Sequence, residues 1–193
     1  MLNLIPSRGK TKFLHICMIL PCIALLFFIT SCERGLVYEK NEKINLGQWN
    51  QNDHVDFDVM IDDTIATHNF YINIRHGGNY QFSNIFMFIN TRMPDGKFFR
   101  DTIECSLSAD DGRWYGSGIG DIRDVRILFK KNLVFPFKGK YHFGIEQAMR
   151  MNPLPYLFDV GIRIVKANAE EDKSIRSFFR FQNHVVSTPS EKK

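Results

Sequence analysis

Residues 55–61 read VDFDVMI, and this stretch decides the fold class. Its apolar side chains stand at every second position, with aspartates and a methionine between them. Because neighbouring side chains of an extended chain point to opposite faces, the pattern is typical of a β-strand with one buried face and one face in water. Residues 70–75, which read FYINIR, repeat the alternation. No stretch of ten or more residues shows the spacing of an amphipathic helix.

The same period of two continues as far as Val165. Tyr80–Ile89 becomes apolar on both faces, as expected of a central strand, and residues 94–96 (PDG) predict a turn before a strand over Phe98–Leu107. The remaining strands are expected in three alternating runs and, more weakly, in two short runs near the start: Val125–Phe129, Tyr141–Ile145, Phe158–Ile164, Leu36–Tyr38 and Ile44–Leu46. Eight or nine strands separated by turn residues predict an all-β fold, an antiparallel β-sandwich of jelly-roll or immunoglobulin-like topology.

The N-terminal segment has the composition of a secretory leader. Basic residues at positions 8–12 precede Phe13–Thr30, an apolar run without charge, and small residues follow in ITSC at positions 29–32. This motif resembles the lipobox of bacterial lipoproteins, in which the cysteine is acylated and the preceding peptide is removed. Residues 1–31 are therefore predicted to be a lipoprotein signal peptide, with Cys32 as the lipid attachment site. The alternative is an uncleaved anchor, although this run has 18 residues and a span needs roughly 20.

Removal of the leader would leave 162 of the 193 residues, enough for one domain with a sizeable core. Three of the 25 basic residues and none of the 21 acidic residues lie in the leader. The mature chain would hold 22 basic and 21 acidic residues, a net charge of +1. Nucleic-acid binding requires a basic surface, so no nucleic-acid partner is predicted.

Only one cysteine follows Cys32 in the chain, and this is Cys105. It therefore has no partner for an intrachain disulfide. Cys105 shares its alternation with Ile103 and Leu107, which places it on the buried face of a strand. Because a thiol in apolar surroundings is unreactive, Cys105 is interpreted as a core residue.

Few residues have the arrangement that catalysis or ion binding requires. The glycine-rich run GSGIG at residues 116–120 lacks the following helix of a phosphate-binding loop, and a hairpin connection is predicted instead. Residues 110–111 and Asp121 could hold calcium, although turn formation explains each aspartate more simply. Dispersed carboxylates such as residues 62–63 leave a hydrolase as a minor alternative.

The histidines after Cys32 do not suggest a metal site. No two of them have close metal-ligand spacing, and no pair of cysteines is available to join them. No metal and no cofactor are predicted, and no Gly-x-Ser-x-Gly nucleophile motif is present. Each histidine is expected on the solvated surface: His54, His68, His76, His142 and His184.

Trp114 and Tyr115 stand among glycines and polar residues on a connection between two predicted strands. If exposed, the two rings would form a binding face for sugar or protein. If buried, they would cap one end of the sandwich. The sequence supports both interpretations equally.

A set of short motifs follows a fixed order between residues 32 and 166. In chain order they are Cys32, Trp49, DDT at 62–64, Tyr80 with SNIF at 83–86, PDG at 94–96, DTIE at 101–104, GRWYGSG at 112–118, FP at 135–136, GKY at 139–141 with IEQAMR at 145–150, and DVG at 159–161. Each motif alone is weak, but the ordered set resembles the gliding-motility lipoprotein GldH family of Bacteroidetes bacteria.

This resemblance implies a lipid-anchored cell-envelope protein that supports gliding and is associated with the type IX secretion machinery. It implies no enzymatic activity and no cofactor, and only Cys32 is carried over as a site. The expected partners are a membrane, through the lipid on Cys32, and other gliding or secretion proteins of the envelope. The expected location is the outer membrane, facing the periplasm.

Three segments are therefore expected: a signal peptide at 1–31, a β-sandwich lipoprotein domain at 32–166 and a partly disordered C-terminal extension at 167–193. The extension lies outside the resemblance. A glycan-binding envelope lipoprotein that uses Trp114 and Tyr115 is the main alternative function.

Overall fold

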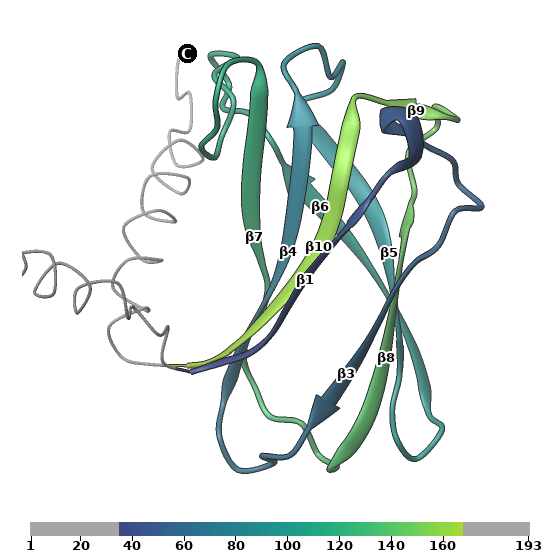
Figure 1. The fold of residues 1–193 in the computed structure, drawn as a ribbon, viewed down its shortest axis with the longest axis vertical. Helices are drawn as coiled ribbons and strands as arrows, with labels where there is room; N and C mark the ends of the chain where they lie inside the picture. Colours follow the sequence, from purple (N-terminus) through teal and green to yellow (C-terminus); the bar gives the residue numbers. More distant parts are fainter. Residues whose placement is uncertain (1–34, 168–193) are drawn as a thin grey trace, which may run out of the picture. The chain divides into compact units, whose positions relative to one another are not determined.

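The computed structural model describes residues 35–167, which form two antiparallel four-stranded sheets packed face to face (Figure 1). Sheet A has the order β1 (Leu36–Lys43), β10 (Leu157–Lys166), β4 (His68–Gly77) and β7 (Ile122–Leu133). Sheet C has the order β3 (Val55–Ile61), β8 (Gly139–Gln147), β5 (Asn84–Arg92) and β6 (Phe98–Ser106). A two-stranded sheet pairs β2 (Gln48–Trp49) with β9 (Leu154–Pro155). The predicted all-β sandwich is confirmed.

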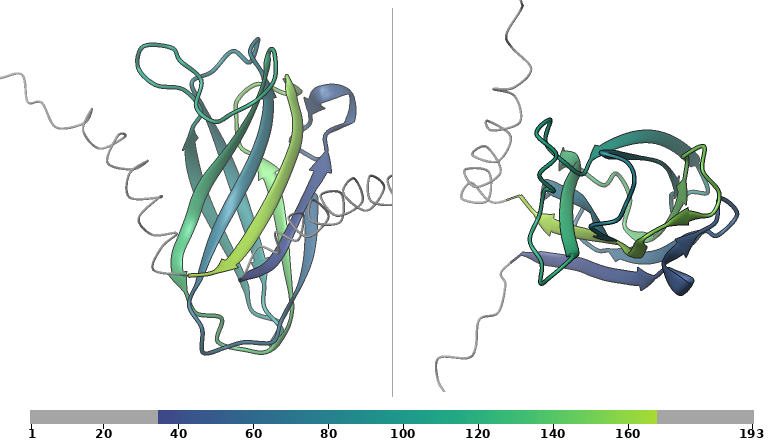
Figure 2. Two further views of the ribbon diagram at one scale, coloured as in Figure 1. Left: turned by 60° about the vertical axis from the view of Figure 1, so that its left-hand side comes forward. Right: turned by 90° about the horizontal axis from the view of Figure 1, so that it is seen from above.

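The strands pair as a nested series. β5 pairs with β6, β4 with β7, β3 with β8, β2 with β9 and β1 with β10. The chain thus folds as one long hairpin, and two further ladders, β10 with β4 and β8 with β5, join the ribbon to itself. These pairings give a jelly roll, which decides between the two topologies that the sequence left open. Figure 2 shows the wrapped ribbon from the side and from above.

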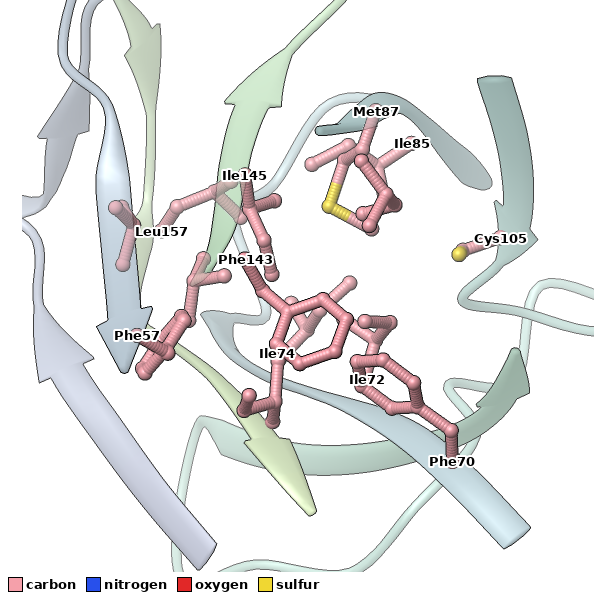
Figure 3. Packing of buried hydrophobic residues seen from close by; sticks show 14 of the residues in the cluster. Phe57, Phe70, Ile72, Ile74, Ile85, Met87, Cys105, Phe143, Ile145 and Leu157 are labelled. Atoms are coloured by element: carbon pink, nitrogen blue, oxygen red, sulfur yellow. The ribbon is translucent and has the colours of Figure 1, made fainter. Parts of the chain in front are cut away.

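Alternate side chains of both sheets meet in one apolar core. Figure 3 shows Phe143 of sheet C beside Phe70 and Ile74 of sheet A, with Phe57 of sheet C at the edge of the same cluster. The rings of Phe70 and Phe143 lie edge to face, with centroids 4.9 Å apart, an arrangement that aromatic pairs prefer. The alternation of residues 55–61 is therefore a strand whose apolar half lies in this core.

Most predicted strands and turns are present in the structure. The turn at residues 94–96 joins β5 to β6, and Gly96 has a φ of 86°. The strand expected at Ile44–Leu46 is wrong, because Asn45–Gly47 forms a 3-10 helix, η2. Leu46 has a φ of 53°, which a strand does not accept. β5 also begins later than predicted: Tyr80 lies in the preceding loop, where its hydroxyl donates to the Asn84 carbonyl at 3.0 Å.

Each sheet has a glycine in the middle of its outer face. In sheet A the cross-strand neighbours are Asn41, Gly161, Asn73 and Arg126. In sheet C the corresponding row is Asp56, Gly144, Asn90 and Arg100. The two rows differ only at the first position, which is Asn41 in sheet A and Asp56 in sheet C, and neither has a side chain at its second position.

Alanine at these two glycines should have different effects. In Gly161→Ala the added carbon would lie 1.9 Å from Asn41 Oδ1 and 2.5 Å from the Lys40 carbonyl oxygen. The carbonyl belongs to the paired strand β1, so we expect a loss of about 1–3 kcal/mol in the free energy of unfolding. In Gly144→Ala the one tight contact of the added carbon is with Asp56 Oδ1 at 3.0 Å, and this side chain can turn away; Asn90 Cβ lies at an ordinary 3.8 Å.

Gly144→Ala is therefore the matched control for Gly161→Ala. It should leave stability unchanged or raise it by up to about 1 kcal/mol, because alanine restricts the unfolded chain. Urea denaturation of both variants measures the difference. Equal losses would contradict the role assigned to the close approach of β1 and β10.

Candidate functional site

A hydrogen-bonded triad lies on the outer face of sheet A. Arg126 Nε donates to Asn73 Oδ1 at 3.0 Å, and Arg126 Nη2 donates to Glu39 Oε1 at 2.8 Å. Asn73 Nδ2 donates to the same Glu39 oxygen at 3.3 Å and to Asn41 Oδ1 at 3.1 Å. The triad spans the sheet because Glu39 on β1 reaches over Gly161, which has no side chain between the two strands.

Sheet C carries a second triad of the same composition. Arg100 Nη1 donates to Asn90 Oδ1 at 3.2 Å, and Arg100 Nη2 donates to Glu146 Oε2 at 2.9 Å. Asn90 Nδ2 also donates to Glu146, and the Arg100 guanidinium lies 4.1 Å from the centroid of the Phe88 ring. The two arginines are similarly exposed: 48% of the Arg126 side chain and 43% of the Arg100 side chain are accessible.

A cleft of about 870 Å³ lies beside the triad of sheet A. Polar side chains from all four strands of this sheet line it: Glu39, Asn41, Asn73, Arg75, Asp124, Arg126 and Asp159. Arg75 bridges its neighbours, with Nε 2.6 Å from Asp124 Oδ1 and Nη1 3.1 Å from Asp159 Oδ2. The cleft thus offers fixed amide, guanidinium and carboxylate groups to a polar ligand or a peptide segment.

The connection between β6 and β7 forms one wall of this cleft. Tyr115 and Ser117 line it, and the Tyr115 backbone N–H donates to the Leu107 carbonyl at 2.8 Å. Ser117 pairs with Asp124 in an antiparallel bridge, so the run at residues 116–120 turns back onto β7. The hairpin connection predicted for this run is confirmed.

Trp114 faces a different part of the molecule from Tyr115. Its indole is half-buried and packs against the core, with its centroid 4.7 Å from the His76 ring and 6.4 Å from the Tyr80 ring. Trp114 therefore covers one end of the sandwich, whereas Tyr115 reaches the cleft. The structure does not bring the two rings together as one platform.

The surface position predicted for His68 and His76 is wrong. Both residues are buried, with exposed fractions of 1% and 0%. They lie on β4 in the same alternation as Phe70, Ile72 and Ile74, so the spacing that identifies the core face also applies to them. Burial lowers the pKa of both imidazoles below its usual value. His54 and His142 are exposed as expected, and His184 lies outside the described residues.

Cys105 is buried, as predicted, with 1% of its surface exposed. Burial raises the pKa of its thiol to about 12, which makes the thiolate nucleophile unavailable near neutral pH. Within residues 35–167, no three His, Cys, Asp or Glu side chains are grouped closely enough to hold a metal ion. Asp111 instead accepts hydrogen bonds from Arg113, and Asp63 accepts the backbone N–H groups of Ile65 and Ala66.

The predicted lipid site, Cys32, lies outside the described residues, as do the leader at 1–31 and residues 168–193. The described domain begins at Gly35, three positions after Cys32. In the described range, no helix is long and apolar enough to cross a bilayer.

A family model described as GldH lipoprotein matches residues 36–164, nearly the whole described domain. The chain belongs to the GldH lipoprotein family. The resemblance drawn from the ordered sequence motifs is therefore confirmed.

Two relatives cover most of the chain. A gliding motility lipoprotein GldH homolog of Christiangramia forsetii is 33% identical over 153 residues, 76% of this chain and 93% of the relative. The gliding motility lipoprotein GldH of Flavobacterium johnsoniae is 31% identical over the same shares.

Similar solved structures include a family GH115 4-O-methyl-α-glucuronidase, at a TM-score of 0.37 and 13% identity, covering 72% of this chain and 18% of that chain. A VP2 subviral particle of infectious bursal disease virus has a TM-score of 0.29 and 10% identity, covering 86% of this chain and 38% of that chain. Likenesses at these scores say nothing about function.

The buried imidazole of His76 should make the domain less stable in acid. The unfolded chain takes up this proton near pH 6.5, whereas burial lowers the pKa in the folded domain. Stability is thus complete above about pH 6.5 and declines below it, by at most about 1.4 kcal/mol per pH unit for one histidine. His76→Phe removes this contribution, and we expect its free energy of unfolding to fall less steeply than that of the wild type between about pH 7 and 5. Denaturant unfolding at a series of pH values measures both slopes, and identical slopes would refute the assignment.

Proposed function

We propose that this protein is a lipid-anchored protein of the cell envelope, attached through Cys32, that supports gliding motility, the type IX secretion machinery or both. Membership in the GldH lipoprotein family carries the proposal, because the relatives are named gliding motility lipoproteins. The sequence supports the anchor: the apolar run Phe13–Thr30 ends just before Cys32, and the folded domain begins at Gly35. Two or more acyl chains hold a protein on a membrane stably, whereas one chain holds it only marginally.

We place the protein in the outer membrane, facing the periplasm. The residues that follow Cys32 are Glu33, Arg34 and Gly35, which form no acidic cluster. We regard such a cluster as the feature that would favour export to the cell surface, and its absence from these positions favours the periplasmic side.

We further propose that the protein acts through contacts with other proteins, without catalysis. The cleft on sheet A supports this, because three of its four carboxylates contact an arginine: Glu39 contacts Arg126, and Asp124 and Asp159 contact Arg75. The fourth, Glu104, accepts a hydrogen bond from Asn84 Nδ2 at 2.6 Å. Fixed charges of both signs suit recognition of a partner surface with the complementary pattern.

Replacement of the anchoring cysteine tests the main proposal. A strain that lacks the gene should lose gliding, secretion of type IX cargo, or both, and the wild-type gene should restore what is lost. Cys32→Ala should fail to restore it, and the protein should leave the membrane fraction, because no acyl chain can be attached. Cys105→Ala is the control, since it changes the only other cysteine after residue 31 and should restore function. Normal gliding and secretion in the deletion strain would refute the proposal.

Glycan binding is a second candidate function, and the position of Tyr115 favours it. This ring lines the cleft beside Asn73 and Arg126, so it could contact a sugar while the polar side chains bind hydroxyl groups. Trp114 packs against the core and contributes nothing to this version of the site.

The two triads provide a matched test of the cleft. Arg126→Glu places a negative charge beside Glu39 in the cleft, and Arg100→Glu makes the equivalent change beside Glu146 on sheet C. Because both arginines are about half exposed in similar networks, we expect similar losses of stability, of about 1 kcal/mol each. Only Arg126→Glu should abolish rescue of the deletion strain.

Binding of the wild-type protein to a sugar array, lost in Arg126→Glu and kept in Arg100→Glu, would favour the glycan function. Equal loss of rescue in both variants, or loss in neither, would remove the cleft from the proposal.

A further inference from the structure

The chain enters the domain at one end of the sandwich. The Gly35 carbonyl accepts the Lys166 backbone N–H at 2.8 Å, and the next residue, Ala167, donates to the Thr67 carbonyl at 2.8 Å. His68 is the register partner of Leu133, at the end of β7. The start of β1, the β3–β4 connection and the β7–β8 loop therefore lie toward the same end, which we call the N-terminal end; in Figure 1 the loops are at the bottom and the start of β1 is at the lower left. The β5–β6 turn lies there too, because Lys97 Nζ is 5.8 Å from the centroid of the Phe137 ring.

Exposed apolar side chains gather at the N-terminal end. The β3–β4 connection contributes Ile65, the residue after the β5–β6 turn is Phe98, and the β7–β8 loop contributes Val134 and Phe137; their exposed fractions are 90%, 56%, 45% and 40%. Phe99 is also exposed, and beside it opens a pocket of about 250 Å³ whose lining is mostly apolar. Exposed apolar patches of this kind mark interaction sites.

The loops of the opposite end carry both apolar and acidic residues. Leu46 and Ile119 are highly exposed there, on separate loops, and Ile122 and Tyr156 are exposed to 41% and 39%. The β6–β7 connection that holds Ile119 also holds Asp110, Asp111 and Asp121. At the N-terminal end, the β3–β4 connection holds two aspartates at residues 62–63 and the β5–β6 turn holds Asp95, whereas the β7–β8 loop, residues 134–138, holds one lysine and no acidic residue.

The short covalent link between Cys32 and Gly35 indicates what the N-terminal end can contact. Only three residue steps separate Cys32 from Gly35, a reach of at most about 11 Å. A lipid on Cys32 thus keeps the N-terminal end close to the bilayer surface, whatever the conformation of these residues. We infer that this end, through Ile65, Phe98, Phe99, Val134 and Phe137, rests on the surface of the membrane as a second contact. The inference depends on the lipid at Cys32 that the proposed function assigns.

The chemistry of the patch fits a lipid interface. Phenylalanine and aliphatic side chains enter the boundary between head groups and acyl chains, and lysines beside them reach toward lipid phosphates. Lys97 and Lys138 are exposed next to Phe98 and Phe137, and Lys97 Nζ also lies 3.0 Å from Asp95 Oδ2. The two contacts, acyl chains and apolar loops, would then fix which end of the domain faces the membrane.

Site-specific fluorescence on the mature, full-length protein tests this orientation. The protein is purified from host membranes and reconstituted into vesicles of phosphatidylethanolamine and phosphatidylglycerol that contain a nitroxide-labelled lipid. Ile65→Cys and Phe137→Cys report on the N-terminal end, whereas Leu46→Cys and Ile119→Cys are matched controls at the other end. Cys105 is buried, so an environment-sensitive dye labels only the introduced cysteine.

We expect the nitroxide lipid to quench dyes at 65 and 137 strongly and dyes at 46 and 119 weakly. In the background of Phe98→Glu with Val134→Glu, quenching at 65 should fall, while Leu46→Glu with Ile119→Glu should leave it unchanged. Equal quenching at both ends overturns the inference. Shielding of the dye at 65 without quenching by lipid also overturns it, because a second copy of the protein would then cover the patch. A wild-type protein that carries no acyl mass and does not float with vesicles overturns the proposed anchor itself.

Discussion

Antiparallel pairing between strands far apart in the sequence is the interaction on which the rest of this structure depends. Leu36 pairs with Val165, and the ladders that follow it inward end at the β5–β6 turn. β10 lies between β1 and β4, and β8 lies between β3 and β5, so each of these two strands satisfies backbone groups on both sides. Without them, four strands would be left with unpaired edges, and the two inner faces would not meet over a common core.

The central glycines link this backbone arrangement to the outer surfaces. A side chain at Gly161 would collide with β1, and its absence lets Glu39 extend across β10 toward Asn73 and Arg126. The triad of sheet A therefore results from strand spacing as much as from the polar residues themselves. The side chains of this triad are already hydrogen-bonded to one another. A ligand of the cleft would therefore meet an ordered set of donors and acceptors, and its binding would not include the entropic cost of ordering them.

The alternation of apolar residues was sufficient to predict most of the strands and the burial of Cys105, and the PDG motif was sufficient to predict the turn at residues 94–96, since all of these follow from local geometry. The alternation was not sufficient to predict the topology, because the pattern of one strand does not specify which other strand it pairs with. The alternation that includes Phe70 and Ile72 also predicts a buried position for His68 and His76. The expectation of a surface position followed from residue type alone. The sequence does not predict η2, because leucine is common in strands and nothing in the sequence indicates the positive φ of Leu46. The sequence does not predict the cleft either, because Arg126 becomes a neighbour of Asn73 and Arg75 only when β4 pairs with β7.

The cleft and the apolar patch of the N-terminal end lie at different positions along the strands. On β4, His68 lies at the N-terminal end, and Arg75, which lines the cleft, lies seven residues further along. At about 3.3 Å per residue, this places the far side of the cleft roughly 23 Å from the end next to Cys32. The lining of the cleft comes from sheet A, the end of β6 and the β6–β7 connection, and includes no residue of the β3–β4, β5–β6 or β7–β8 loops. A domain resting on its N-terminal end would hold the cleft above the lipid head groups, where a protein or a glycan of the envelope could reach it without displacing the domain from the membrane.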